Sequence, residues 1–299
     1  MVNDRPIAAA TPRTRSHLGS SIFINAVVIF CAILCIVPVI HIISLSMSGR
    51  TAVLARKVTL WPVDIDFKAY MSVFMDKSMI TALWYSVLLT VGYTVFAMIG
   101  SILLAYPLSR NYLPGRKTLM LFVLIPMYFA GGIIPEYLWI KDLKLIDNPL
   151  ALVLPVLISS YNTIILRNFF QSIPTSLEES AHLDGCSDWG VLIKIVLPLS
   201  TASLATIALF YAVMRWNTFA DVRYYINSTK FYTLQMKLYQ VVFNSTDTEV
   251  NMLEGGRNAV LSETIKAAAI VFSTVPIVIV YPFVQKYFVS GVMIGAVKG

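Results

Sequence analysis

Charged residues are scarce in this chain. Asp, Glu, Lys and Arg make up 13% of its 299 residues, whereas soluble domains usually carry about 25%. This scarcity excludes an ordinary soluble globular domain. Cysteine and histidine are also scarce, with three residues of each. Cys31, Cys35 and Cys186 lack the spacing of a metal site, so we interpret them as packing residues.

The sequence instead contains long apolar segments without any charged residue. A membrane-spanning helix needs roughly 17–25 apolar residues, whereas a barrel strand needs only about 9–11. Six windows free of Asp, Glu, Lys and Arg have the length of a helix: 22–47, 78–109, 118–135, 148–166, 195–214 and 267–285. The predicted fold is therefore an all-α integral membrane protein with six transmembrane helices.

Prolines lie inside these windows. In a membrane bundle, neighbouring helices and hydroxyl side chains can satisfy the backbone carbonyls that a proline leaves free. We therefore expect the windows to remain helical in spite of Pro38, Pro107, Pro126, Pro155, Pro276 and Pro282.

The orientation in the membrane is predicted from the basic residues of short segments. Arg13 and Arg15 precede the first window, and Arg110, Arg116 and Lys117 lie between the second and third. These positions weigh most in the positive-inside rule, so we expect both termini in the cytoplasm. The domain organisation is then a cytoplasmic segment 1–21, a transmembrane domain 22–289 with a cytoplasmic loop 167–199 and an external loop 215–266, and a cytoplasmic tail 290–299.

The cytoplasmic segment "PTSLEESAHLDG" reads as a short helix with its own end signals. Ser176 and Glu179 have the spacing of a capping box, and Gly185 can supply the left-handed residue that ends the helix. A second helix is predicted from Ser187 or Asp188 to Pro198. Such a segment is either a simple elbow between two spans or a rigid protrusion that docks on a soluble partner.

The spacing of this segment carries a resemblance to a known family. Glu179-Ser180-Ala181, then Gly185 after three residues, Ile195 after nine more, and Leu197-Pro198 resemble the EAA loop, E-A-A-x3-G-x9-I-x-L-P, of the membrane subunits of binding-protein-dependent ABC importers. Ser180 is the single departure. The stretches "WYSVLLT", "LKLIDNPLALVLP" and "MRWNTFADVRYYI" are similar to the carbohydrate-importing branch.

This resemblance implies a type I permease bundle of six helices in the bacterial cytoplasmic membrane. It also implies a second permease subunit, two ATPase subunits and an external solute-binding protein as partners. ATP and magnesium would be bound by the ATPase chains, so that this chain is not an enzyme and needs no cofactor or metal. The residues expected to couple it to the ATPase are Glu178, Glu179, Ala181, Asp184, Gly185, Ile195, Leu197 and Pro198.

Polar and aromatic residues near membrane depth are candidates for the substrate path. Aromatic rings stack on sugar faces, and amides and hydroxyls bond sugar hydroxyls. The competing interpretation is that tryptophan and tyrosine form an interfacial belt and that polar groups bond between helices. The candidates are Tyr128, Tyr161, Asn162, Arg215, Trp216 and Asn217.

The charge balance suggests a substrate class. The net charge is +7, and the predicted external loop holds Arg215, Arg223, Lys230 and Lys237. A basic vestibule attracts an anionic solute or an acidic partner face. An oligo- or polysaccharide with acidic groups, such as alginate, agrees with both the charge and the resemblance, although a neutral sugar or an acidic binding protein remains an alternative.

Two other classes of membrane protein were weighed. An ion-coupled secondary transporter or channel predicts acidic or histidine residues within the spans, and only His41 meets that condition. A membrane-embedded enzyme needs catalytic groups that converge at one depth, whereas the histidines lie at positions 17, 41 and 182. Nothing in the sequence points to nucleic acid, and no G-x-x-x-x-G-K-[ST] motif for a nucleotide is present.

Overall fold

The structure is a computed structural model that describes residues 16–250 and 258–296. Residues 1–15 of the predicted N-terminal segment, 251–257 of the predicted external loop and 297–299 of the predicted tail lie outside the described residues.

The regular secondary structure of the described residues is helical, as predicted. Its β structure within these residues is one isolated bridge between Ser48 and Ile65. The elements are α1 (Ser16–Ser46), α2 (Arg50–Leu54), α3 (Lys68–Met75), α4 (Lys77–Ser109), α5 (Arg116–Tyr128), α6 (Ile133–Asp142), η1 (Pro149–Leu152), η2 (Leu154–Val156), α7 (Ser160–Gln171), α8 (Thr175–Leu183), α9 (Asp188–Val191), the π-helix η3 (Leu192–Val196), α10 (Leu197–Leu199), α11 (Thr201–Asn217), α12 (Ala220–Tyr225), η4 (Thr229–Phe231), α13 (Leu234–Val250) and α14 (Asn258–Ala296).

Three helices are long and apolar enough to cross a bilayer alone, and three further spans are bent. The long spans are Ser21–Ser46, Lys77–Ser109 and Glu263–Pro282. The bent spans are Arg116–Tyr128 with Ile133–Asp142 at 116°, Pro149–Val156 with Ser160–Gln171 at 50°, and Asp188–Leu199 with Thr201–Asn217 at 83°. Counting each bent pair as one span gives up to six, but windows 118–135, 148–166 and 195–214 are not continuous helices.

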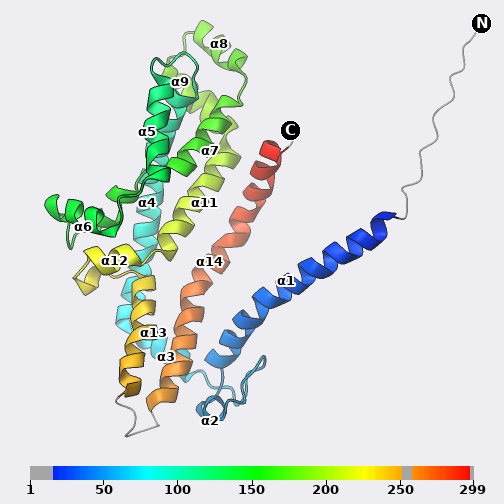
Figure 1. Cartoon of the computed structure of the whole chain (residues 1–299), viewed down its shortest axis with the longest axis vertical. Coiled ribbons are helices and arrows are strands. Elements are labelled where there is room, and N and C mark those ends of the chain that lie inside the picture. Colours follow the sequence, from blue (N-terminus) through cyan, green and yellow to red (C-terminus); the bar gives the residue numbers. More distant parts are fainter. Residues whose placement is uncertain (1–15, 251–257, 297–299) are drawn as a thin grey trace, which may run out of the picture.

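The helices define two ends of an elongated bundle (Figure 1). α8 and α9 lie at one end, and α2 and α3 lie at the other, with α4 running between them. α6 and α12 pack against each other partway along the bundle. The two segments predicted to share the cytoplasmic side, the α4–α5 connection and the loop that contains α8, thus lie at the same end.

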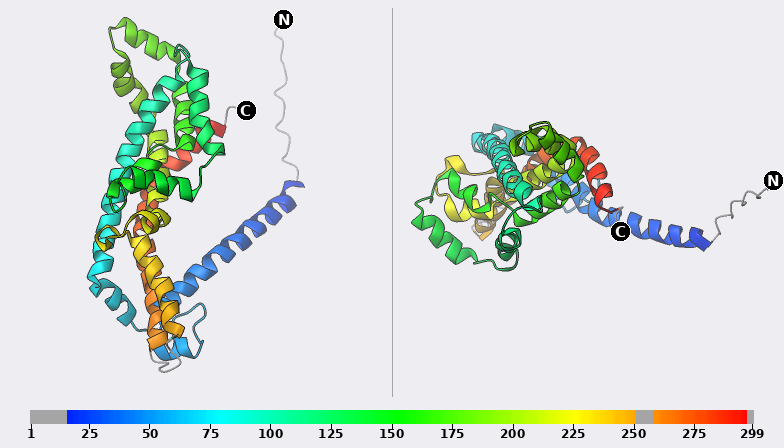
Figure 2. Two further views of the ribbon diagram at one scale, coloured as in Figure 1. Left: turned by 60° about the vertical axis from the view of Figure 1, so that its left-hand side comes forward. Right: turned by 90° about the horizontal axis from the view of Figure 1, so that it is seen from above.

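α1 stands apart from the other helices. It packs against α14, and both further views show it diverging from the bundle towards its N-terminal end (Figure 2). Its side chains from residue 21 to residue 41 are exposed, and nearly all of them are apolar. An apolar helix of this length needs a lipid or protein environment around it.

The bend before α7 is held by tyrosine hydroxyls from two other helices. Tyr93 of α4 donates a hydrogen bond to the carbonyl of Val156 (2.7 Å). The Tyr211 hydroxyl of α11 accepts from the Ser159 backbone N–H (3.0 Å) and shares a hydrogen bond with Ser101 of α4 (2.6 Å). Polar backbone groups freed by a broken helix must find partners inside a membrane protein, and these hydroxyls supply them.

The Tyr211→Phe substitution tests this account. It leaves the buried Ser101 hydroxyl and the Ser159 N–H without their shared partner, which is expected to lower the free energy of unfolding by about 1–3 kcal/mol. The melting temperature of the detergent-solubilised protein measures the loss. Tyr161→Phe is the matched control, because Tyr161 lies on α7 and is 58% exposed. Equal melting temperatures for the two variants would contradict the role of Tyr211.

Candidate functional site

The corner between α8 and α9 is a glycine-terminated helix end. Gly185 has φ +84°, a conformation that side chains other than glycine adopt at a cost. The Gly185 N–H bonds the His182 carbonyl (3.0 Å), and the Cys186 N–H bonds the Ala181 carbonyl (2.9 Å). This pair of bonds is the Schellman motif. The prediction that Gly185 ends the first helix is confirmed.

The start of α8 differs from the prediction. The helix begins at Thr175, directly after Pro174, and has no side-chain cap. Ser176 therefore lies inside the first turn, whereas a capping side chain must belong to the residue just outside it. The predicted capping box of Ser176 and Glu179 is wrong. The second helix begins at Asp188 as predicted, with the Ser187 hydroxyl accepting from the Gly190 N–H (3.3 Å).

A buried ion pair joins α8 to the end of α4. A guanidinium nitrogen of Arg110 lies 2.5 Å from a carboxylate oxygen of Glu178, and the two side chains are 4% and 8% exposed. The two atoms are in ionic contact without the alignment of a hydrogen bond. The Arg110 guanidinium also lies over the Tyr106 ring, 4.7 Å from its centroid, and donates to the Phe170 carbonyl (3.4 Å).

Burial and the neighbouring charge act on Glu178 in opposite directions. Burial raises the pKa of Glu178 above its usual value, and the positive charge of Arg110 lowers it in part. A carboxylate removed from water is costly unless a counter-charge lies beside it. Arg110 is therefore the residue that lets Glu178 face inwards.

The two faces of α8 differ. Glu178 and Ala181 are three residues apart, on one face, and both are buried against the bundle. The opposite side presents Glu179 and Leu183, of which Leu183 is 89% exposed. The helix α8 therefore has one face fixed against the bundle and one exposed face.

The rest of the predicted coupling set lies behind this helix. Ile195 and Leu197 pack against a buried cluster that includes Ala181, whereas Asp184 and Pro198 are exposed. The buried members of that cluster are Ala105, Tyr106, Leu166, Phe170, Ile173, Ala181, Val191, Leu192 and Val196. The predicted coupling loop thus shares one core with α4 and α7.

Arg215, a candidate for the substrate path, is buried and already paired. Its guanidinium donates two hydrogen bonds to Asp221, at 2.6 and 3.0 Å, and one to the Leu152 carbonyl, at 2.8 Å. It is 2% exposed. This network ties the end of α11 to α12 and η1, and its charge is neutralised within the bundle.

The other path candidates differ in their exposure. Tyr128 and Tyr161 are 77% and 58% exposed, and Asn162 and Trp216 are buried. Asn217 is exposed and donates to the Val213 carbonyl of its own helix (2.9 Å). A path through these residues stays a prediction.

Three cations of the predicted external loop lie over aromatic rings. The Arg223 guanidinium is 4.8 Å from the Tyr239 ring centroid, and it also donates to the Tyr239 hydroxyl (2.5 Å). The Nζ atoms of Lys230 and Lys237 lie 4.6 Å and 5.4 Å from the ring centroids of Phe231 and Tyr232.

The acidic groups near these cations are engaged elsewhere. Asp147 accepts from the Ser228 hydroxyl and from the Ser228 and Asn227 N–H groups. These bonds, together with the charge of Lys230, hold the pKa of Asp147 below its usual range. Within the part of the chain that the structure describes, no carboxylate forms an ion pair with Arg223, Lys230 or Lys237.

Sequence reasoning missed the partners of the buried charges. From the sequence, Arg110 is used only to predict the orientation in the membrane, and Asp221 is not named as a candidate residue. A signal for Arg110 exists in the sequence, since it is the first charge after the second apolar window. The described residues contain no group of three or more His, Cys, Asp or Glu side chains that could hold a metal ion.

Comparison with known proteins places this geometry in a family. Residues 21–294 match the family described as "Binding-protein-dependent transport system inner membrane component". The chain is 45% identical over 269 residues to the polygalacturonan/rhamnogalacturonan transport system permease protein YtcP of Bacillus subtilis, covering 90% of this chain and 94% of that one. It is 42% identical over 265 residues to the protein LplC of Bacillus subtilis, covering 88% and 90%.

A solved structure shares the fold. It belongs to a bacterial ABC transporter involved in the import of the acidic polysaccharide alginate. The TM-score is 0.83 at 34% sequence identity, and the match covers 93% of this chain and 100% of that chain. The type I permease bundle predicted from the sequence is confirmed.

Replacing Arg110 by leucine tests the buried ion pair. The variant keeps a buried Glu178 carboxylate without its counter-charge, which is expected to cost about 3–5 kcal/mol of stability. Without Arg110, the pKa of Glu178 rises further. Protonation of the Glu178 carboxyl then stabilises the folded state. This stabilisation is fully present below the usual glutamate pKa, and it is lost as the pH rises through the raised pKa of Glu178 in the folded state. Melting temperatures between about pH 4 and pH 8 measure this dependence.

Two further variants serve as controls for this prediction. Arg110→Leu combined with Glu178→Leu removes both charges, so most of the stability should return and the added pH dependence should disappear. Glu179→Leu alters the neighbouring exposed carboxylate and should leave the melting temperature nearly unchanged. A pH-independent melting temperature in Arg110→Leu alone would contradict the ion-pair account.

Proposed function

Because the chain belongs to the family of binding-protein-dependent transport system inner membrane components, we propose that it forms half of the translocation path of an ATP-driven importer of acidic oligo- or polysaccharides. It is a permease subunit of a carbohydrate ABC importer. As a transport component it is not an enzyme. The hydrolysis of ATP, with its magnesium ion, is assigned to partner ATPase chains.

The substrate class is carried by the similar proteins and supported by the charges of this chain. Polygalacturonan is a substrate in the name of the relative at 45% identity, and alginate is imported by the transporter whose structure is 34% identical. Both are polymers of sugar acids. The cations Arg223, Lys230 and Lys237 lie over aromatic rings, and no carboxylate of the described residues forms an ion pair with them. A guanidinium or ammonium beside a ring suits a ligand with carboxylates on a sugar face.

The coupling mechanism follows from the two faces of α8. Its outer face, with Leu183 and Glu179, would lie in a cleft of the ATPase, and its inner face is fastened to α4 through Glu178 and Arg110. When ATP binding draws the two ATPase domains together, a rigid α8 would carry the shared core with it. The bundle then changes from inward-open to outward-open, as alternating access requires.

The partners follow from the surfaces that the chain leaves uncovered. α1 exposes apolar side chains over most of its length and packs mainly against α14, which supports its burial by a second permease subunit and by lipid. The external solute-binding protein would deliver the saccharide at the end that holds α2 and α3. Both chain termini would then lie in the cytoplasm of the bacterial cell, on the α8 side of its membrane.

Gly185→Val tests the coupling role of the corner. No other atom lies within 4 Å of the Cβ that would be added at Gly185, so the substitution acts through its strained positive φ rather than through a clash. We expect the ratio of saccharide transported to ATP hydrolysed to fall several-fold in proteoliposomes of the complete importer, with normal membrane insertion. Gly185→Asn, which tolerates this conformation better, should be milder.

Gly115 provides a matched control. It also has a positive φ, +72°, with no other atom within 4 Å of its added Cβ, but it lies at the start of α5. Gly115→Val therefore brings comparable backbone strain to the same end of the bundle without changing α8 or α9. If both variants lose coupling equally, the effect is one of general strain and the coupling role of Gly185 is refuted.

The acidic-substrate proposal is tested by uptake of oligogalacturonate and alginate oligomers. Arg223→Gln with Lys237→Gln should raise the KM for these oligomers several-fold at low salt, and added salt should reduce the difference, because screening weakens the attraction. Lys57→Gln is the control, since Lys57 is an exposed cation in the connection between α2 and α3, outside the loop 215–266. Uptake of a neutral oligosaccharide in place of the acidic ones, with no response to these substitutions, would overturn the substrate class.

The class of transporter is tested separately. Co-purification of the chain from native membranes should bring down ATPase subunits, and the saccharide with its binding protein should stimulate ATP hydrolysis by the recovered complex. Transport that is driven by an ion gradient and proceeds without any ATPase would favour the secondary-transporter alternative.

A further inference from the structure

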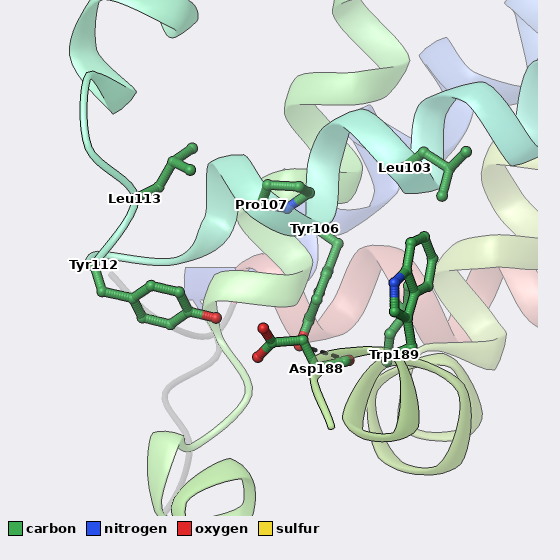
Figure 3. Close-up of a pocket in the computed structure, with 8 residues that line it drawn as sticks. Leu103, Tyr106, Pro107, Tyr112, Leu113, Asp188 and Trp189 are labelled. Carbon is green, nitrogen blue, oxygen red and sulfur yellow. Dashed lines mark hydrogen bonds between the residues drawn. The ribbon is translucent and has the colours of Figure 1, made fainter. Parts of the chain in front are cut away.

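A pocket lies beside the coupling loop, where α4 ends. It has a volume of about 250 Å³ and lies between the last turns of α4, the connection to α5, and α9. The residues that line it are Leu103, Tyr106, Pro107, Tyr112, Leu113, Asp188, Trp189 and Leu192. Figure 3 shows the Asp188 carboxylate with the Tyr112 hydroxyl directed towards it, and the Trp189 ring on the side of Leu103.

The polar groups of this pocket select for a positive charge. Its lining contains one carboxylate, Asp188, and no lysine, arginine or histidine. Burial raises the pKa of the Tyr112 hydroxyl, and the charge of Asp188 acts in the same direction, so Tyr112 stays protonated. Aromatic rings beside a carboxylate are the usual surroundings of a bound ammonium group.

The cations of the protein that lie nearest do not neutralise Asp188 fully. Arg110 is held by Glu178. His182 lies with its Nε2 atom 3.5 Å from the Asp188 carboxylate, and both side chains are largely exposed. Such an exposed contact is weak and contributes only when the imidazole is protonated. The carboxylate therefore remains available to a ligand.

The remainder of the pocket is apolar and lies at the edge of a membrane span. Leu103 and Pro107 belong to the last turns of α4, whose span ends at Ser109. Leu103 is 46% exposed, Trp189 is 62% exposed and Tyr112 is 68% exposed. Tryptophan and tyrosine at the end of a span lie at the level of the lipid headgroups. A pocket at this level meets lipid from the membrane.

We infer that this pocket binds a phospholipid with an ammonium headgroup, the ammonium at Asp188 and the start of an acyl chain along Leu103 and Leu192. Anionic phospholipids are disfavoured, because their negative headgroups would face the Asp188 carboxylate in a pocket whose lining contains no lysine, arginine or histidine. The two walls of the pocket come from α4 and from α9. A bound lipid therefore connects the coupling loop to the bundle, in addition to the Arg110–Glu178 ion pair.

The inference is tested by the lipids that the purified importer retains. The complete complex in detergent is incubated with equal amounts of phosphatidylethanolamine and phosphatidylglycerol, and the bound lipid is counted by native mass spectrometry. Wild-type protein should retain the ethanolamine lipid preferentially. Asp188→Asn should reduce that retention about tenfold, through loss of a charge-assisted hydrogen bond, and Leu103→Trp should displace the lipid by filling the apolar part.

Asp184→Asn is the matched control, because Asp184 is an exposed carboxylate of the same loop that does not line the pocket. It should retain lipid as the wild type does. Equal retention of phosphatidylglycerol, or unchanged retention by both Asp188→Asn and Leu103→Trp, overturns the inference. If the purified complex holds no lipid and Trp189, which lines the pocket, crosslinks to an ATPase chain, then protein covers the pocket in place of lipid. That result also overturns the inference. None of these results depends on the transported saccharide.

Discussion

Every backbone polar group that lies within a bilayer needs a partner inside the protein, and this constraint organises the bundle. Three of the spans are broken, so carbonyl and N–H groups are released at the breaks. Tyr93 and Tyr211 satisfy those at the bend before α7, and Arg215 satisfies a carbonyl of η1. These side chains come from α4 and α11, so these two helices hold the broken span of η1, η2 and α7 in place.

The helix α4 that supports the bend before α7 also contacts the predicted coupling loop. Its C-terminal turns hold Tyr106 and lead directly into Arg110, whose charge is buried with that of Glu178. A displacement of α8 is therefore transmitted to α4 through the Arg110–Glu178 ion pair. Relative movement of the two helices would separate these charges or expose them. Because separating a buried ion pair costs several kcal/mol, the loop and the end of α4 are expected to move as one body.

The sequence predicts the number of spans, the corner at Gly185 and the family spacing, because each depends on local composition or on short fixed separations. It does not predict where the spans break, since Pro126 and Pro155 are compatible with straight and broken helices alike. It also does not predict that Glu178 is buried while Glu179 is exposed. That difference depends on Arg110, which is 68 positions away, and a pairing across that distance leaves no periodic signal.

The placement of positive charge agrees with the transport of an anion. A free arginine within the bundle would hold a carboxylate tightly and slow its release, and conduction requires a site that the solute can leave. The charge of Arg215, which is buried in the bundle, is neutralised by Asp221. Arg223 and Lys237 lie over aromatic rings in the predicted external loop, and no carboxylate of the described residues forms an ion pair with them. Attraction is thus provided where an acidic saccharide would arrive, and the interior is left without an unpaired charge at Arg215.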